Sequence, residues 1–309
     1  MDDKILEVRH VSKKRGHKIV LKDINFSINK GEICGFVGRN GAGKTTLIKI
    51  ITSMLYADEG QVIICGKNLK TEREEALRNV GALVETPIMY EYMTGRQNLN
   101  HISSVIKDVT EGDRENAIKL SNLGVKIDEK VKKYSLGMKQ RLGIAEVLMG
   151  NVSLLILDEP TNGLDPVGVF EFKSVINNLA RKKGVSIFIS SHILSEIENI
   201  CTKIVFIDKG KIISVQKMDN SMKAANGKNI FIKTDSPKES SKVIQSIPYV
   251  KLLKIENKGI SILMDSDISD IFDILKKLHD AKISVQGFFE LKQNLEDKFI
   301  KMMGEDRDE

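Results

Sequence analysis

Residues 38–45, with the sequence GRNGAGKT, match the pattern G-x-x-x-x-G-K-[ST]. They follow the apolar segment 32–37, which is typical of a strand, and they lead into residues 45–53, which are typical of the first turns of a helix. Glycines in this setting let backbone N–H groups converge on phosphate oxygens, and the helix N-terminus favours negative charge. The pattern therefore predicts a phosphate-binding loop, and a glycine-rich turn without a ligand is the alternative. The residues expected around the phosphates are Gly38, Arg39, Asn40, Gly41, Ala42, Gly43, Lys44, Thr45 and Thr46.

Two residues of this loop and two later carboxylates carry groups suited to a nucleoside triphosphate. Lys44 can reach the β- and γ-phosphates, and the hydroxyl of Thr45 can bind Mg²⁺. Residues 152–157 form a nearly continuous apolar run, which is typical of a parallel strand covered on both faces. We expect Asp158, which follows, to hold Mg²⁺ through water and Glu159 to polarise an attacking water as general base. A solvated acidic pair at a strand end is the alternative.

The composition argues against some classes of function. The chain has 309 residues and a net charge of +6, which is spread along the chain instead of gathered in a patch. Tryptophan is absent and aromatic residues make up 5%, so no platform for stacking bases is visible and we expect no nucleic-acid partner. No run approaches the about 18 apolar residues of a membrane-spanning helix, and the N-terminus lacks the pattern of a signal peptide. Cys34, Cys65 and Cys201 lie in strand-like apolar segments, which predicts buried free thiols in a reducing cytosol.

The order of elements predicts two domains. Strands alternate with helices through residues 1–217, as in a layered α/β core, and residues 94–124 look helical with Thr94 as a cap. A polar stretch then marks the start of a second domain, residues 218–309. Its pattern is strand, helix, strand, strand, helix, strand, a ferredoxin-like α+β arrangement, followed by a closing helix over residues 294–303.

The order of motifs resembles that of the ATP-binding subunit of an ABC transporter. A third motif, YSLGMKQRL at residues 134–142, is similar to the family's signature sequence, with Leu136 where glycine is usual. The resemblance implies that Ser135 and Gly137, at the start of this helix, contact the γ-phosphate that the opposite subunit holds. A helix N-terminus with free N–H groups is a physically suitable anion site.

Two further segments follow in the family's order. Residues 162–165, NGLD, match the loop that crosses the dimer interface, so the resemblance implies that Asp165 contacts the other subunit besides capping the next helix. His192 matches the switch histidine, which resembles a clamp between the γ-phosphate and Glu159. The resemblance covers residues 4 to about 217. It implies a P-loop NTPase of the ABC type, with a mixed-sheet core, an antiparallel N-terminal subdomain and a helical subdomain.

Two positions depart from the family pattern. Glu85 stands where glutamine is usual, and there it adds negative charge near Asp158 and Glu159 and attracts metal more strongly. We therefore count it among the catalytic and metal-binding candidates. Together with the signature motif, it resembles the bacitracin-resistance and lantibiotic self-protection branch. Arg15 stands where an aromatic residue usually stacks on adenine, and a guanidinium plane can stack on a base instead.

The resemblance implies the ATP-hydrolysing motor of a membrane exporter, held at the cytoplasmic face of the membrane by integral-membrane permease subunits. Two copies, or one copy and a related ATP-binding subunit, would clasp two ATP molecules head to tail. A soluble ABC-type ATPase in cofactor assembly or regulation is the alternative, and the second domain either supports the dimer or senses a ligand. Residues 86–99 lie where the family docks its membrane partner. Apolar surface for this partner would come from Met89, Tyr90, Tyr92 and Met93, and ordinary helix and loop packing of these side chains is the alternative.

Overall fold

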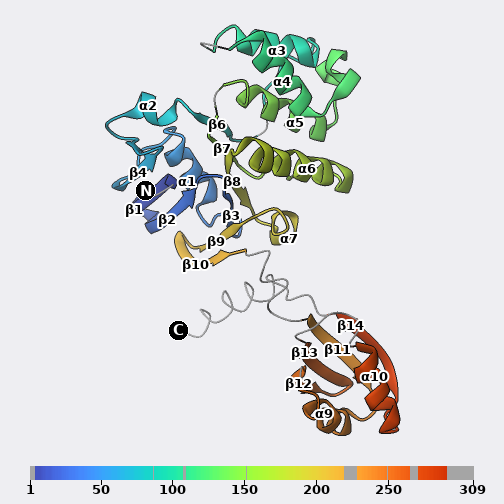
Figure 1. Ribbon diagram of the computed structural model, residues 1–309. Coiled ribbons are helices and arrows are strands. Elements are labelled where there is room, and N and C mark those ends of the chain that lie inside the picture. Colours follow the sequence, from blue (N-terminus) through green and yellow to red (C-terminus); the bar gives the residue numbers. More distant parts are fainter. Residues whose placement is uncertain are drawn as a thin grey trace. The chain divides into compact units, whose positions relative to one another are not determined.

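The computed structural model describes residues 4–85, 87–106, 109–150, 152–218, 228–248, 250–264 and 271–290. The chain divides into two units, residues 1–217 and 218–309, whose elements can be followed by label and colour in Figure 1. The closing helix predicted for residues 294–303 lies outside the described residues.

A six-stranded sheet forms the centre of the first unit. Its order is β10-β9-β3-β8-β7-β6, with parallel pairing from β9 to β6 and an antiparallel β10 at one edge. The three middle strands consist only of buried residues, as expected for parallel strands covered on both faces. The strands are β3 (Ile33–Val37), β6 (Val80–Leu83), β7 (Leu154–Leu157), β8 (Ser186–Ser191), β9 (Lys203–Asp208) and β10 (Lys211–Lys217).

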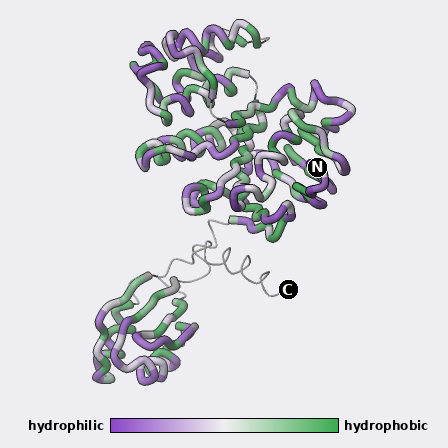
Figure 2. Tube along the Cα trace, turned by 180° about the vertical axis from the view of Figure 1, so that it is seen from behind, coloured by the Kyte–Doolittle hydropathy of each residue, from purple (hydrophilic) through white to green (hydrophobic). Residues whose placement is uncertain are grey.

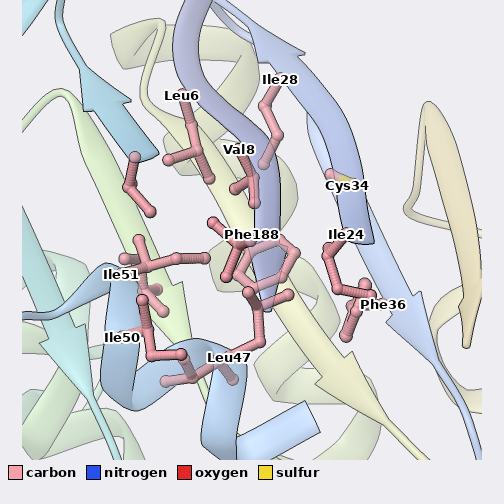
Figure 3. Close-up of a cluster of buried hydrophobic side chains, with 14 of the residues drawn as sticks. Leu6, Val8, Ile24, Ile28, Cys34, Phe36, Leu47, Ile50, Ile51 and Phe188 are labelled. Carbon is pink, nitrogen blue, oxygen red and sulfur yellow. The ribbon is translucent and has the colours of Figure 1, made fainter. Parts of the chain in front are cut away.

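A four-stranded antiparallel sheet of order β2-β1-β4-β5 shares a core with the central sheet and α1. Figure 3 shows side chains of β1, β2, β3, β8 and α1 directed toward one another in this core. The rings of Phe36 and Phe188 are buried in this core and the partly buried ring of Phe26 packs against them, with centroids 5.4, 5.6 and 5.7 Å apart. The elements are β1 (Lys4–Arg15), β2 (Lys18–Asn29), α1 (Lys44–Ile51), β4 (Glu59–Ile64), β5 (Lys67–Asn68) and α2 (Arg73–Leu77).

The region between β6 and β7 is helical, and it is divided more finely than the sequence indicates. The stretch 94–124 contains two helices, because each has its own capping box: Thr94 with Gln97, and Thr110 with Asp113. A capping box satisfies free N–H groups at a helix start, so the second box begins a new helix within the stretch. The elements are α3 (Gly95–Ser103), α4 (Glu111–Ser121), the 3₁₀ helices Gly124–Asp128 and Val131–Lys133, and α5 (Leu136–Val147).

Two helices, α6 (Pro166–Lys183) and α7 (Leu194–Ile197), complete the first unit. Asp165 caps α6 by accepting a hydrogen bond from the N–H of Gly168 at 2.9 Å, and the helix ends at Gly184 with a φ of 65°. Hydrophilic and hydrophobic residues alternate along α6 (Figure 2), as expected for a helix with one face on a core. No helix in the described ranges combines the length and the apolar character needed to cross a membrane.

The described residues of the second unit form one antiparallel sheet of order β12-β13-β11-β14 and two helices. Its elements follow the order strand, helix, strand, strand, helix, strand. Alternate residues of the central strands, among them Ile230, Ile232, Ile260 and Ile262, are buried in one core with residues of both helices. The elements are β11 (Lys228–Thr234), α9 (Pro237–Gln245), β12 (Val250–Glu256), β13 (Gly259–Met264), α10 (Ile271–Asp280) and β14 (Val285–Glu290).

The three cysteines are free thiols, but they differ in burial. Cys34 and Cys201 are buried as predicted, and burial raises the pKa of the Cys34 thiol far above its ordinary value and that of Cys201 to about 12. Cys65 is exposed, so the prediction for this residue is wrong. It lies just after β4 with a φ of 51°, in the turn toward β5 rather than in the strand.

One carboxyl group of α5 makes the stability of the first unit depend on pH. Burial raises the pKa of Glu146 from its ordinary value of 4.5 to about 7. Between these values the folded chain keeps a proton that the unfolded chain has released, so the free energy of unfolding falls as pH rises and levels off above the folded pKa. We expect Glu146→Gln to raise the free energy of unfolding by about 1–3 kcal/mol at pH 8 and by less at pH 5.

Urea denaturation at both pH values measures this difference. Glu74→Gln on α2 is the control, because Glu74 is exposed and its replacement should have the same small effect at pH 5 and pH 8. An equal effect of Glu146→Gln at both pH values would contradict the assignment.

Candidate nucleotide-binding site

The glycine-rich loop between β3 and α1 is built directly on β9 and on the turn that follows it. A Cβ on Gly38 would come within 2.3 Å of the carbonyl oxygen of Ile207, and Gly43 has a φ of 110°. Both positions therefore require glycine. The N–H of Gly210, between β9 and β10, donates to the carbonyl of Ala42 at 3.0 Å, so the hairpin also fixes the loop from outside.

Lys44 is directed into this loop. The side chain is 6% exposed, and its Nζ donates to the carbonyl of Gly38 at 2.6 Å and to that of Arg39 at 3.2 Å. Thr45 and Thr46 follow in the first turn of α1, with Thr46 buried. At the tip of the loop, Arg39, Asn40 and Gly41 are exposed. The loop thus presents its ammonium group and the start of a helix on one side, as an anion site requires.

The predicted carboxylates lie at the ends of neighbouring strands. Because β7 pairs with β8 and β8 with β3, all in parallel, their carboxyl ends meet at one edge of the sheet. Asp158, directly after β7, is 8% exposed. Its Oδ1 accepts a hydrogen bond from the hydroxyl of Ser190 at 2.6 Å, and its N–H donates to the carbonyl of Leu83 at 3.0 Å. The carboxylate is therefore fixed from both neighbouring strands.

Glu159 connects the loop lysine with the predicted switch histidine. Its Oε1 lies 3.1 Å from Nζ of Lys44, and its Oε2 lies 2.7 Å from Nδ1 of His192. The N–H of His192 also points at Oε2, at 3.3 Å. Glu159 adopts a φ of 48°, a strained value for a residue other than glycine. The structure thus brings together Lys44, Glu159 and His192, which are far apart in the sequence.

Ser190 is a member of the site that the sequence analysis did not assign. It is fully buried at the end of β8. Its hydroxyl donates to Asp158 and accepts a hydrogen bond from the N–H of Glu159 at 2.9 Å. The only signal in the sequence is a pair of serines, Ser190 and Ser191, at the end of an otherwise mostly apolar strand.

Two further predicted site residues form no hydrogen bond or ion pair with this cluster within the described residues. Glu85 is 69% exposed and has a φ of 69°. Its carboxylate lies 3.0 Å from Nζ of Lys49 on α1, and within the described ranges it forms no hydrogen bond or ion pair with Asp158 or Glu159. Arg15 lies at the exposed end of β1, where the register places it opposite Lys18.

The signature residues form a second, solvent-facing group. Ser135 caps α5 by accepting a hydrogen bond from the N–H of Met138 at 3.2 Å. A Cβ on Gly137 would lie 3.7 Å from Cα of Gly168 and 3.7 Å from Cδ2 of Leu164. The start of α5 therefore packs beside the start of α6 and its cap Asp165. Ser135 and Asp165 are both exposed, so polar groups from two helix starts face solvent together.

Comparisons with known proteins agree with this fold and identify the family. Residues 21–162 match the family model described as ABC transporter. The chain is 34% identical over 305 residues to the "Uncharacterized ABC transporter ATP-binding protein YhcH" of Bacillus subtilis (strain 168), covering 99% of this chain and 98% of the relative. It is 34% identical to the "Bacitracin transport ATP-binding protein BcrA" of Bacillus licheniformis, covering 97% of each chain. It is 38% identical to the "Lantibiotic transport ATP-binding protein SrtF" of Streptococcus pyogenes, covering 70% of this chain and 93% of the relative.

The solved structures show the same fold. The structure of cbiO1 from Clostridium perfringens, described as part of the ABC transporter complex cbiONQ, superposes with a TM-score of 0.65 at 26% identity, over 70% of this chain and 89% of that chain. Fold and site together define an ABC-type ATPase. The chain belongs to the family of ABC transporter ATP-binding proteins, which confirms the resemblance inferred from its motifs.

We expect Ser190→Ala to lower the rate of ATP hydrolysis. Removing the hydroxyl leaves Asp158 Oδ1 and the N–H of Glu159 without their buried partner, which costs about 1–3 kcal/mol and loosens the position of both carboxylates. A fall in kcat of roughly tenfold is expected from such a loss of geometry, measured by phosphate release.

The matched control for this variant is Ser186→Ala on the same strand. Ser186 is equally buried, and its hydroxyl accepts a hydrogen bond from the N–H of Gly31 at 2.9 Å, but it lies at the other end of β8. It should lose similar stability and keep its kcat. Equal kcat values for the two variants would contradict the role of Ser190.

Proposed function

We propose that this protein is the ATP-hydrolysing motor of a membrane exporter that removes peptide antibiotics. The observation that carries the ATPase part is the grouping of Lys44, Glu159 and His192 at the sheet edge beside the glycine-rich loop. The exporter part is supported by the sequence identity to the bacitracin and lantibiotic transport proteins. The match to the bacitracin transport protein extends over nearly the whole chain.

The side chains divide the chemistry of hydrolysis among them. When ATP binds, Nζ of Lys44 exchanges its hydrogen bonds with the loop carbonyls for bonds with the β- and γ-phosphates. Its positive charge then stabilises the transition state. Glu159 accepts a proton from the attacking water as general base. His192, 2.7 Å from Oε2 of Glu159, holds the carboxylate in position and would contact the γ-phosphate when ATP is bound. The buried hydroxyl of Ser190 keeps Asp158 and the backbone of Glu159 in register.

The residues at this edge fit Mg²⁺. Thr45 supplies a hydroxyl and Asp158 a carboxylate, and no group of three or more His, Cys, Asp or Glu residues gathers within the described part of the chain. A small donor set of this kind suits Mg²⁺, which keeps waters and phosphate oxygens as its other ligands. When bound, the ion neutralises charge on the phosphates. Glu85 stays a candidate ligand, which would have to release Lys49 first.

Two copies complete each other's sites in this proposal. Ser135, Gly137 and Asp165 lie at exposed helix starts, where free N–H groups can reach a γ-phosphate held by another copy. A closed dimer is then favoured because ATP contacts both chains only when they are closed. Shifting such an equilibrium almost completely takes about 5.5 kcal/mol of differential binding. A related ATP-binding subunit could replace the second copy.

The segment before α3 presents an apolar surface for a permease. Ile88 is 97% exposed, and the rings of Tyr90 and Tyr92 lie edge to face at 5.9 Å. The buried side chain of Asn98 accepts from the N–H of Tyr90 at 2.9 Å and donates to the carbonyls of Tyr90 at 3.1 Å and Thr94 at 2.9 Å. The segment is therefore held in one shape. It borders a surface hollow of about 550 Å³ lined by Tyr92, Met93, Gln97, Asn100 and Lys130.

An apolar surface held rigid in this way favours a permease at the cytoplasmic face of the membrane over a soluble ATPase without a membrane partner. Exposed aromatic and aliphatic groups gathered on one segment are typical of interaction sites. A permease segment that carries both apolar and polar side chains would fill the hollow, whose lining includes Gln97, Asn100 and Lys130.

We expect Glu159→Gln to bind ATP and to lose hydrolysis by about 100-fold or more, because glutamine cannot accept the proton of the attacking water. With its γ-phosphate preserved, ATP should trap the two-copy form. Phosphate release and ATP-dependent size-exclusion chromatography measure both effects. A variant that hydrolyses ATP at the wild-type rate would remove the general base from the proposal.

Deleting the gene should increase sensitivity to bacitracin or to a lantibiotic, measured as a lower minimal inhibitory concentration. Wild-type protein should restore resistance, and Glu159→Gln should not. Ile88→Glu should also fail to restore it while keeping ATP hydrolysis, because the charge spoils the docking surface. Val125→Glu is the control, since Val125 is 86% exposed outside that segment. Unchanged sensitivity to every such peptide in the deletion strain would overturn the cargo assignment.

A further inference from the structure

The loop between β7 and α6 is tied to α7 by a side-chain hydrogen bond that the proposed chemistry does not use. The hydroxyl of Thr161 donates to Oε2 of Glu196. Thr161 is 2% exposed, and Glu196 is half-buried within α7. A hydroxyl that donates to a carboxylate forms one of the stronger kinds of hydrogen bond, so the two segments are firmly joined.

The two partners stand close in sequence to the reacting groups. Thr161 lies two residues after Glu159 and four before Asp165, and Glu196 lies four residues after His192. Within the loop, the N–H of residue 162 donates to the carbonyl of Glu159 at 3.1 Å, and the N–H of residue 164 donates to that of Thr161 at 3.1 Å. Fixing Thr161 therefore fixes the whole loop.

The carboxylate of Glu196 has no other evident purpose in the fold. In the ranges that the structure describes, no lysine or arginine lies within ion-pair distance of it, and its side-chain hydrogen bond is the one to Thr161. A half-buried carboxylate is unfavourable unless it is hydrogen-bonded. A residue that contributed only to packing on α7 would not need this group.

We infer that Glu196 is a positioning residue for ATP hydrolysis, which acts through Thr161 on Glu159 and on the loop that carries Asp165. This inference rests on the proposed function, since it takes Glu159 as the general base. The segments that hold Glu159 and His192 are joined by the contact between those two side chains and by the hydroxyl of Ser190. The bond between Glu196 and Thr161 joins them further along both segments. This outer joint keeps Glu159 and His192 in their geometry when the loop contacts another copy.

Loss of the joint should affect turnover more than nucleotide binding. Lys44 and the glycine-rich loop are held by β3, β9 and Gly210, so they stay in place without Glu196. Glu159 and His192 lose their outer support, and small displacements of a reacting group cost about 10- to 100-fold in rate. KM for ATP should stay within about threefold, because the phosphate-binding groups do not move.

The experiment compares kcat, KM for ATP and thermal stability in a set of full-length variants. Glu196→Ala and Thr161→Val each remove one side of the bond, and both should lower kcat by about 10- to 100-fold. Glu196→Gln and Thr161→Ser keep an acceptor and a donor, and both should retain most of the activity. Glu198→Ala is the control two positions further along, at the C-cap of α7, since no side-chain hydrogen bond of Glu198 is found among the described residues.

A double-mutant cycle separates positioning from general destabilisation. Glu196→Ala combined with Thr161→Val should be no slower than either single variant, because one bond is lost in all three. Should Glu196→Ala fail to fold, Thr161→Val carries the same test, with rescue by Thr161→Ser. Three outcomes would overturn the inference. The losses in kcat could add in the double variant, both single variants could keep the wild-type kcat, or Glu198→Ala could lower kcat as much as Glu196→Ala does.

The same assay distinguishes this inference from the function it rests on. If Glu159→Gln is inactive and the Glu196 and Thr161 variants turn over ATP normally, only the role of Glu196 is wrong. If Glu159→Gln keeps the wild-type rate, the general base is wrong and the inference falls with it.

Discussion

The parallel pairing of β3, β8 and β7 determines where every reacting group of this protein lies. Val37 pairs with Ser191, and Leu157 pairs with Ile189. The segments that follow these strands therefore leave the sheet at one edge, which gathers the glycine-rich loop, the two carboxylates and His192. In a strand, a shift of one residue turns each side chain to the opposite face. The apolar side chains that fix the register thus also fix the site.

The same sheet carries a pair of opposite charges at each of its two edges. The surroundings of each pair determine whether it only stabilises the fold or can also bind a ligand. At the opposite edge, Lys203 is buried, and its Nζ lies 2.9 Å from Glu32 and 2.8 Å from the carbonyl of Ser27. Burial alone pushes the pKa of Glu32 upward, but hydrogen bonds from Asn29 and Lys203 lower it overall. This pair joins the starts of strands and faces no phosphate-binding loop.

The pair of Lys44 and Glu159 differs because it lies beyond the carboxyl ends of strands. Lys44 begins α1 and Glu159 stands two residues after β7, and their partners include loop carbonyls and a histidine. An ion pair at the amino ends of strands holds the fold together, whereas one at the carboxyl edge beside the glycine-rich loop can exchange partners with a ligand. The two ion pairs have the same residue types, so their location in the sheet distinguishes the structural pair from the pair that can bind a ligand.

Features written in short stretches of sequence could be predicted, and those that depend on distant contacts could not. The glycine-rich loop, the strand that ends in Asp158 and the helix capped by Asp165 each depend on neighbours within a few residues. Ser190 depends on the pairing of β7 with β8, and a serine at a strand end carries no sign of that pairing.

A local pattern misled at one position, and at another a distant contact holds a predicted residue. Glu85 follows β6, where Leu83 pairs with Leu157 just before Asp158, and its carboxylate pairs with Lys49 on α1, so its place among the metal-binding residues stays a prediction. Cys65 follows an apolar run, so we expected it to be buried within the strand. The strand β4 ends at Ile64, however, and Cys65 is the first residue after it. The motifs therefore identified the site, and the tertiary structure supplied its supports.

The contact between the glycine-rich loop and the β9–β10 hairpin has a mechanical consequence. Gly210 donates to the carbonyl of Ala42 and accepts from the N–H of Lys22, so one residue of the hairpin joins the loop to β2. β10 is also the last strand before the polypeptide leaves the first unit at Lys217. Any rearrangement of the loop backbone around phosphate therefore acts on the turn between β9 and β10, and through this turn on β2 and on β10, which ends at Lys217.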